Sequence, residues 1–169
     1  AIQWASQAGA TVIASASNDE DKAACVEAGA AHVVNHRNED FADQVLAATG
    51  GSLVDRIVDV EFGANLATSM VVLRIGGTIA TYSSTQVTEP KLPFLQMMYK
   101  DITLRFVIVY AMPEEAKEHA IADIHAALSA NTLQHRIAHT LPLEEIAKGN
   151  ELIEKGTIRG AVVLTIDAQ

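Results

Sequence analysis

The sequence is poor in cysteine, in aromatic residues and in long apolar runs. Its single cysteine, Cys25, excludes an internal disulfide and leaves no Cys-x-x-Cys pair for a structural zinc site. No apolar stretch reaches the roughly 18 residues that suggest a membrane span. Aromatic side chains make up only 5% of the 169 residues, which disfavours an aromatic-rich β-sandwich. We therefore expect a cytoplasmic protein with an aliphatic core.

Basic residues are also scarce relative to acidic ones. The formal net charge is -9, and no run of Lys and Arg makes a local basic patch. A negative surface repels phosphate backbones and anionic lipid, so we expect neither nucleic acid nor a membrane surface as a partner. With 49% hydrophobic and 20% charged residues, the chain can nevertheless bury one substantial core.

Short aliphatic strands alternate with helices along most of the chain. Glycines end the expected helices, at Gly9, Gly29, Gly50 and Gly76. This alternation is typical of an α/β fold with a doubly wound parallel sheet and helices on both faces. The strands are expected at residues 11–16, 31–35, 54–60, 78–82 and 102–110.

Local signals place the other elements. Ser17 and Glu20 have the spacing of a capping box, with Ser17 as the N-cap of the next helix. We expect further helices at residues 65–73, 94–100, 113–130 and 143–155, a loop at residues 83–93 and a last strand at residues 160–166. The change of character near residue 132 predicts two parts, a nucleotide-binding domain at residues 1–131 and a carboxyl-terminal segment at residues 132–169.

Several runs, in this order and spacing, resemble the medium-chain dehydrogenase/reductase superfamily, and within it the zeta-crystallin-like quinone oxidoreductases. The resemblance covers essentially the whole chain. The matching runs are residues 1–5, 28–37 (AGAAHVVNHR), 54–59 (VDRIVD), 76–79 (GGTI), 142–145 (PLEE) and 160–164 (GAVVL).

The resemblance implies a Rossmann-like nucleotide-binding domain in an enzyme that passes hydride from NADPH to quinones or other electron-poor alkenes and carbonyls. It also implies that a catalytic domain, a first strand and a Gly-rich turn precede Ala1. A Rossmann sheet has the strand order 3-2-1-4-5-6, so its first strand lies at the centre. The strands at residues 11–16 and 54–60 would flank the position of that first strand. Because hydride transfer is direct, the resemblance implies no catalytic base in this chain.

The end of the strand at residues 11–16 decides the expected cofactor. NAD-specific folds of this type usually end that strand with Asp or Glu, which repels a 2′-phosphate. Here the strand is followed by Ser17 and Asn18, and Lys22 lies one helical turn further. We therefore expect NADPH, with Ser17, Asn18 and Lys22 around the 2′-phosphate, although Ser17 also serves as a helix cap. The acidic side chains of residues 19–21 are explained by the helix itself, because negative charge is stabilising near a helix N-terminus.

Five further residues match family positions along the cofactor. His36 and Arg37 follow the expected strand at residues 31–35, near the adenosine end, where a solvated loop explains them equally well. Tyr82 and Ser83 match the position beside the nicotinamide, and a half-buried strand tyrosine is the alternative for Tyr82. Phe62 also lies close to the cofactor in relatives, and packing explains it as readily.

Two other functions stay open. A zinc-dependent alcohol dehydrogenase of the same superfamily would carry its zinc ligands in the preceding domain, and we assign no metal ligand among the six histidines. A non-catalytic dimerising module is the second alternative. In relatives, the strand that corresponds to residues Ile102 to Tyr110 joins two nucleotide-binding domains into one sheet. We therefore expect a homodimer through this strand.

Overall fold

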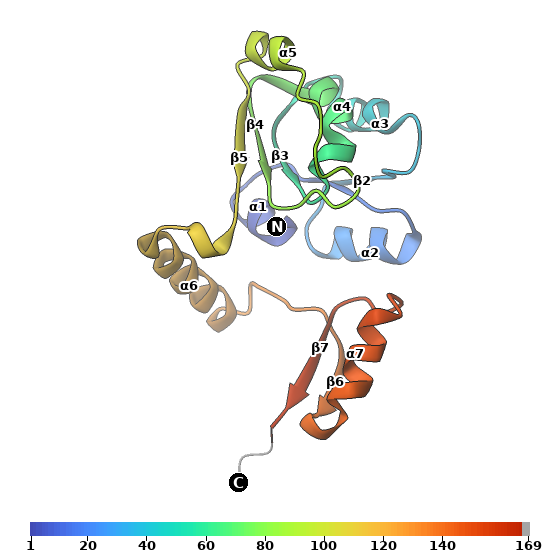
Figure 1. Ribbon diagram of the computed structural model, residues 1–169, viewed down its shortest axis with the longest axis vertical. Helices are drawn as coiled ribbons and strands as arrows, with labels where there is room; N and C mark the ends of the chain where they lie inside the picture. Colours follow the sequence, from blue (N-terminus) through green and yellow to red (C-terminus); the bar gives the residue numbers. More distant parts are fainter. Residues whose placement is uncertain (167–169) are drawn as a thin grey trace. The chain divides into compact units, whose positions relative to one another are not determined.

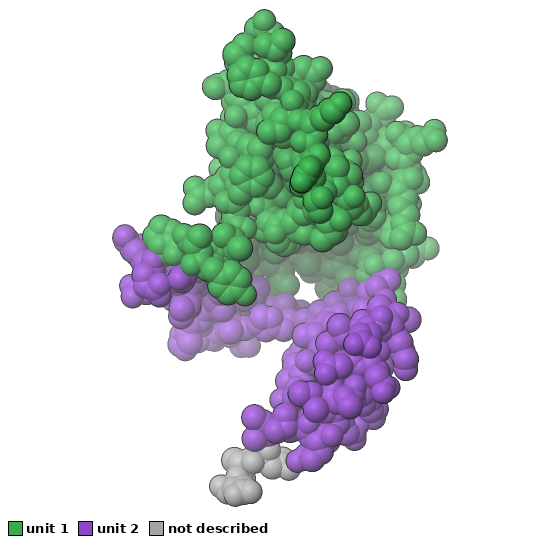
Figure 2. All heavy atoms as spheres, viewed as in Figure 1, with its two compact units in different colours: residues 1–113 green, residues 114–169 purple. Residues whose placement is uncertain are grey.

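The computed structural model describes residues 1–166 of the chain. These residues form two compact units, one of residues 1–113 and the other from Glu114 onward (Figure 2). Each unit has its own helices and parallel strands. None of the described helices is both long enough and apolar enough to cross a membrane.

The first unit confirms the predicted alternation of strands and helices (Figure 1). Each predicted strand is present, although most are shorter at their ends than the sequence pattern. The elements are α1 (Ile2–Gln7), β1 (Ile13–Ser15), α2 (Asp19–Glu27), β2 (His32–Val34), α3 (Phe41–Ala48), β3 (Val54–Asp59), α4 (Phe62–Val72), β4 (Leu73–Thr81), α5 (Phe94–Tyr99), β5 (Thr103–Phe106) and a 3-10 turn, η1 (Val109–Ala111).

All strand pairs in this unit are parallel, as predicted. β1 pairs with β2, and β3, β4 and β5 form a separate sheet in that order. Among residues 1–166, no ladder of hydrogen bonds joins β1 to β3. The two strands predicted to flank a position without a strand therefore belong to two different sheets.

Side chains hold the two sheets to a common core. One buried cluster consists of Phe62, Leu66, Met70, Leu73 and Ile79. A second contains Val34 of β2, Val45 of α3 and Val72 of α4. Ile57 of β3 packs against both clusters, and Ile13 of β1 packs against the second. Helices α3 and α4, which lie side by side in Figure 1, supply much of both clusters.

The start of α2 differs from the predicted capping box. Asn18, and not Ser17, is the N-cap, and its Oδ1 accepts a hydrogen bond from the Asp21 amide at 2.8 Å. Its Nδ2 also donates to Asp21 Oδ2 at 2.7 Å. Asn and Ser cap helices about equally well, so the side chain that lies one residue nearer the helix takes the position.

The passage from α4 to β4 also differs from the prediction. We expected the helix at residues 65–73 to stop at Gly76, but α4 begins at Phe62 and β4 follows at Leu73 without a loop. The Lys100 ammonium donates to the carbonyls of Met70 and Leu73 at 2.6 and 2.7 Å. These bonds satisfy carbonyls that a helix end otherwise leaves without partners, so no glycine cap is needed.

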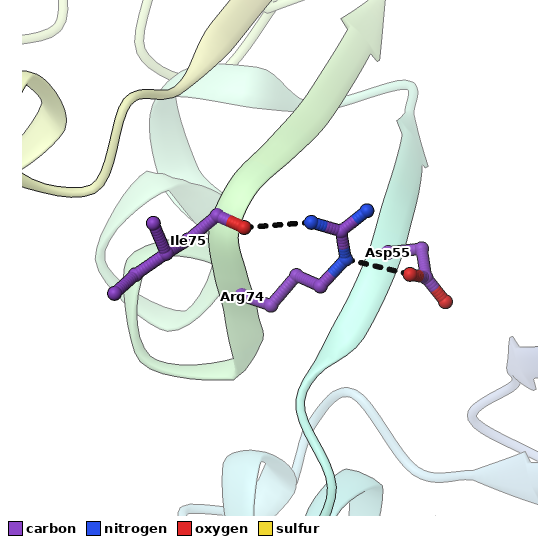
Figure 3. A network of polar contacts seen from close by, with 3 residues as sticks. All are labelled: Asp55, Arg74 and Ile75. Atoms are coloured by element: carbon purple, nitrogen blue, oxygen red, sulfur yellow. Dashed lines mark hydrogen bonds and ion pairs between the residues drawn. The ribbon is translucent and has the colours of Figure 1, made fainter.

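Gly76 instead lies in an irregularity within β4, with φ of 71°. Arg74 fixes this region, as Figure 3 shows: its Nε donates to Asp55 Oδ1 at 2.6 Å and its Nη1 to the Ile75 carbonyl at 2.7 Å. Both Arg74 and Asp55 are largely exposed, so the ion pair contributes to local geometry more than to stability.

Strand β5 is shorter than the predicted strand of residues 102–110. Its ladder ends at Phe106, and the Val107 amide makes one more bond to the Thr81 carbonyl at 2.8 Å. The chain then turns into η1, so Tyr110 is not in a strand. The β-branched pattern continues past Phe106, but no described strand lies beyond β5 to extend the pairing.

The second unit contains α6 (Glu114–Ser129), β6 (Ile137–Pro142), a 3-10 turn η2 (Leu143–Glu145), α7 (Ile146–Glu154) and β7 (Ala161–Thr165). The predicted helices and last strand are confirmed. β6 and β7 are parallel, and Gly149 of α7 faces Leu141, Val162 and Leu164. The unit begins with the first residue of α6, Glu114, whereas the predicted domain boundary follows residue 131, and that boundary stays a prediction.

Candidate functional site

A pocket of about 260 Å³ lies at the carboxyl ends of β4 and β5. It brings together three residues predicted from the sequence to lie close to the cofactor: Phe62, Tyr82 and Ser83. Carboxyl ends of parallel strands are where such sheets bind ligands. The complete lining is Phe62, Thr81, Tyr82, Ser83, Ser84, Phe106, Val107 and Ile108.

One wall of the pocket is aromatic. Phe62 is 3% exposed, and its ring meets the Phe106 ring edge to face, with centroids 6.0 Å apart and an interplanar angle of 80°. This geometry is the one that aromatic pairs favour. Tyr82, by contrast, is 62% exposed, so it is not the half-buried strand tyrosine that the sequence left open.

The end of β3 is organised by Asp59, which is 5% exposed. Its Oδ1 accepts hydrogen bonds from the Glu61 amide at 2.8 Å and from Asn65 Nδ2 at 2.9 Å. Its Oδ2 has no hydrogen-bond partner among the described residues. A buried carboxylate oxygen usually has a donor, so Oδ2 is an acceptor that no described donor uses.

The segments that follow β3 and β4 are bonded to each other. The Phe62 amide donates to the Ser83 carbonyl at 3.1 Å, and the Gly63 amide donates to Ser84 Oγ at 2.8 Å. Glu61 adds three more bonds, from the Thr85 amide (2.9 Å), the Thr85 hydroxyl (2.7 Å) and the Gln86 amide (2.9 Å). The pocket wall at Ser83 and Ser84 is therefore attached to the start of α4.

These bonds lower the pKa of Glu61 below its ordinary value. The Thr85 hydroxyl has the largest effect, and the backbone amides of Thr85, Gln86 and Val87 act in the same direction, against the opposing effect of desolvation. Sequence analysis missed Glu61, because its partners lie more than twenty residues away along the chain. Its position, two residues after the strand-end Asp59, is the one signal that could have indicated it.

The predicted phosphate-binding residues Ser17, Asn18 and Lys22 lie together at the start of α2, directly after β1. The Asn18 side chain is engaged in the helix cap. Lys22 is exposed, and within residues 1–166 its ammonium has no hydrogen bond or ion pair. A free cation near a helix N-terminus is available to an anionic ligand.

His36 and Arg37 follow β2 and are exposed. The Arg37 amide donates to Asn35 Oδ1 at 3.0 Å, a local turn, and neither side chain lines the pocket at β4 and β5. Since β1 and β2 are adjacent and parallel, these residues lie at the same sheet edge as Ser17. The structure thus places the predicted residues in two groups, one after β1 and β2 and one after β3 and β4.

A second cavity, of about 380 Å³, lies between α4 and the segment that follows β4. Gly63, Leu66 and Met70 of α4 line it, together with Val87 and Lys91. Within the described part of the chain, no group of three or more His, Cys, Asp or Glu side chains could hold a metal ion.

Comparison with known proteins gives consistent matches. A family model described as zinc-binding dehydrogenase matches residues 1–126. A 2-haloacrylate reductase of Burkholderia sp is 28% identical over 174 aligned residues, which cover 96% of this chain and 50% of the relative. A quinone oxidoreductase of Sus scrofa is 25% identical, with 98% of this chain and 50% of the relative covered.

Solved structures share the fold. The crystal structure of a 2-haloacrylate reductase superimposes with a TM-score of 0.87 at 26% identity, covering 99% of this chain and 53% of that one. The chain spans about half the length of the curated relatives that it matches.

Proposed function

Because this chain belongs to the zinc-binding dehydrogenase family of the medium-chain dehydrogenase/reductase superfamily, we propose that it is the nucleotide-binding part of an NADPH-dependent reductase. The acceptor would be a quinone or another electron-poor alkene or carbonyl. The observation that carries the proposal is the pocket of Phe62, Tyr82 and Ser83 at the carboxyl ends of the strands.

The pocket fits a planar, mostly apolar ring with a polar substituent. Phe62 and Phe106 supply the apolar wall, and the Ser83 and Ser84 region supplies hydrogen-bonding groups. A bound nicotinamide would supply the hydride. The chain's own residues would orient the ring and keep the reaction away from solvent.

The preference for NADPH is supported by the residues after β1. No carboxylate stands at the strand end, where it would repel a 2′-phosphate, and Lys22 is a free exposed cation one turn into α2. Ser17 adds a hydroxyl at the same place. Alcohol dehydrogenases that hold zinc would do so in another domain, so this region is compatible with either chemistry.

Residues of both groups respond to the dinucleotide if the proposal is right. In NMR spectra of the chain titrated with NADPH, we expect amide shifts at Tyr82 and Ser83 together with shifts at Asn18 and Lys22. Shifts confined to the second unit, or to neither group, would show that these two edges do not form a dinucleotide site.

We also propose that the chain forms a homodimer through β5, which is shorter than the strand predicted at residues 102–110. β5 is the terminal strand of its sheet, and its outer edge has no strand beside it among the described residues. Phe106, Ile108 and Tyr110 are 70%, 58% and 87% exposed. The same surface favours a dimerising module as the second candidate function. Sedimentation at micromolar concentration tests both, because a monomer contradicts this interface.

A further inference from the structure

Glu61 connects the end of β3 to a loop that follows β4, the 83–87 loop (residues 83–87). We propose that Glu61 is a positioning residue that holds this loop as a wall of the cofactor pocket. The inference rests on the proposed function in one respect, namely that the pocket receives the dinucleotide.

The Glu61 carboxylate uses both of its oxygens on the loop. Oε2 accepts from the amide and the hydroxyl of Thr85, and Oε1 accepts from the Gln86 amide. Bonds from neutral donors to a carboxylate are stronger than bonds between neutral groups. Glu61 is itself oriented by its amide, which donates to the buried Asp59 at 2.8 Å.

Gly63 provides a second, independent attachment. Its amide donates to Ser84 Oγ, and the Ser84 hydroxyl donates to the Val87 carbonyl at 2.6 Å. A Cβ on Gly63 would lie 2.2 Å from the Val87 carbonyl oxygen, so only glycine lets the loop approach this closely. The loop therefore packs directly on the first turn of α4.

The 83–87 loop forms part of both cavities described above. Ser83 and Ser84 line the pocket at β4 and β5, whereas Val87 lines the cavity beside α4. If the loop moved, both cavities would change shape. The position of Glu61 thus determines where Ser83 and Ser84 lie relative to a bound ring.

Glu61 is not needed for the apolar core. It belongs to neither buried cluster, and its own side chain is partly exposed. Replacing it should release Thr85 and Gln86 of the loop while α4 and the sheet stay folded. That separation makes the role testable.

The test compares Glu61→Ala and Glu61→Gln with Glu89→Gln, a matched control that removes one negative charge from an exposed position after the same loop. NMR amide exchange is measured on the chain without ligand, and NADPH affinity is measured by calorimetry. We expect Glu61→Ala to speed exchange of the Thr85 and Gln86 amides by about tenfold, the scale of one charged hydrogen bond. Glu61→Gln keeps one acceptor oxygen and should lie between.

Affinity for NADPH should also fall by about tenfold in Glu61→Ala, where the loop amides exchange faster. It should stay unchanged in Glu89→Gln. Unchanged exchange in Glu61→Ala, or faster exchange with unchanged NADPH affinity, would overturn the positioning role. If the unaltered chain binds no dinucleotide, the proposed function fails, while faster loop exchange in Glu61→Ala alone still supports the attachment of the loop by Glu61.

Discussion

The two groups of candidate residues differ in how they are held. After β3 and β4, side chains and amides bond across segments that are distant in sequence, from Asp59 and Glu61 to the 83–87 loop. After β1 and β2, the bonds span fewer residues: Asn18 caps its own helix, Asn35 Oδ1 closes its own turn, and the Asn35 amide donates to Gln44 of the following helix. One region is shaped before any ligand arrives, and the other leaves the Lys22 ammonium without a partner among the described residues.

This difference suits two tasks in dinucleotide binding. A ring that must lie in one orientation gains from a preorganised wall, because the loop does not have to be ordered on binding. A phosphate is recognised by charge and by hydrogen-bond donors, which Lys22 offers without a rigid surround. Substitutions in the first region should therefore change folding and loop order, and substitutions in the second should change affinity alone.

The largest effect is expected at Gly63. In Gly63→Ala the new methyl group meets the Val87 carbonyl oxygen at 2.2 Å, which is backbone that cannot yield without moving the loop. We expect a loss of about 2–3 kcal/mol in the free energy of unfolding, measured with urea. Gly149→Ala is the control, since a Cβ there makes an ordinary contact of 3.5 Å. That helical substitution should stabilise the chain by about 0.5 kcal/mol.

Asp59→Ala comes next. It removes the acceptor of the Glu61 amide and of Asn65 Nδ2, so we expect a loss of about 2 kcal/mol in urea unfolding. Asp59→Asn keeps Oδ1 and alters only the oxygen that has no partner among the described residues. It should cost less than Asp59→Ala. Equal losses would mean that the two hydrogen bonds to Oδ1 do not organise this end of β3.

Lys22→Gln probes the other region. Lys22 is exposed and, in the described part of the chain, unpaired, so stability should change by less than about 0.5 kcal/mol. Affinity for NADPH should fall by about tenfold, because a charged hydrogen bond to the 2′-phosphate is lost, and affinity for NADH should not change. Calorimetry with both nucleotides checks this, and an equal loss for the two would remove Lys22 from the 2′-phosphate.

The smallest effect concerns pH. The pKa of Glu61 is lowered in the folded chain, chiefly by the Thr85 hydroxyl, so its contribution to stability is complete above the ordinary value of 4.5. That contribution is lost as pH falls through the lowered, folded pKa. The Thr85 and Gln86 amide shifts should therefore titrate with a midpoint below 4.5. In Glu61→Gln this titration should vanish; its persistence would assign it to another group.

The same contrast separates what the sequence predicts from what it does not. Alternating strands and helices, and glycines such as Gly9 and Gly29 with positive φ, are local signals, and the parallel α/β fold follows from them. Phe62, Tyr82 and Ser83 line one pocket, because strand ends of a parallel sheet meet at one edge. Their contact with the cofactor stays a prediction.

The misses are contacts between distant parts of the chain. Lys100 satisfies the carbonyls at the end of α4, so β4 starts at Leu73, and no pattern near Gly76 reveals this. Glu61 finds its partners beyond β4. The cap of α2 was wrong for a different reason, because Ser17 and Asn18 are both good caps and spacing alone does not choose between them.

We propose above all that the segments after β1, β2, β3 and β4 together form a dinucleotide site that favours the 2′-phosphate. Calorimetric titration of the chain with NADPH and with NADH, at the same ionic strength, tests it most directly. We expect tighter binding of NADPH, by about tenfold or more. Equal affinities, or a preference for NADH, would contradict the account.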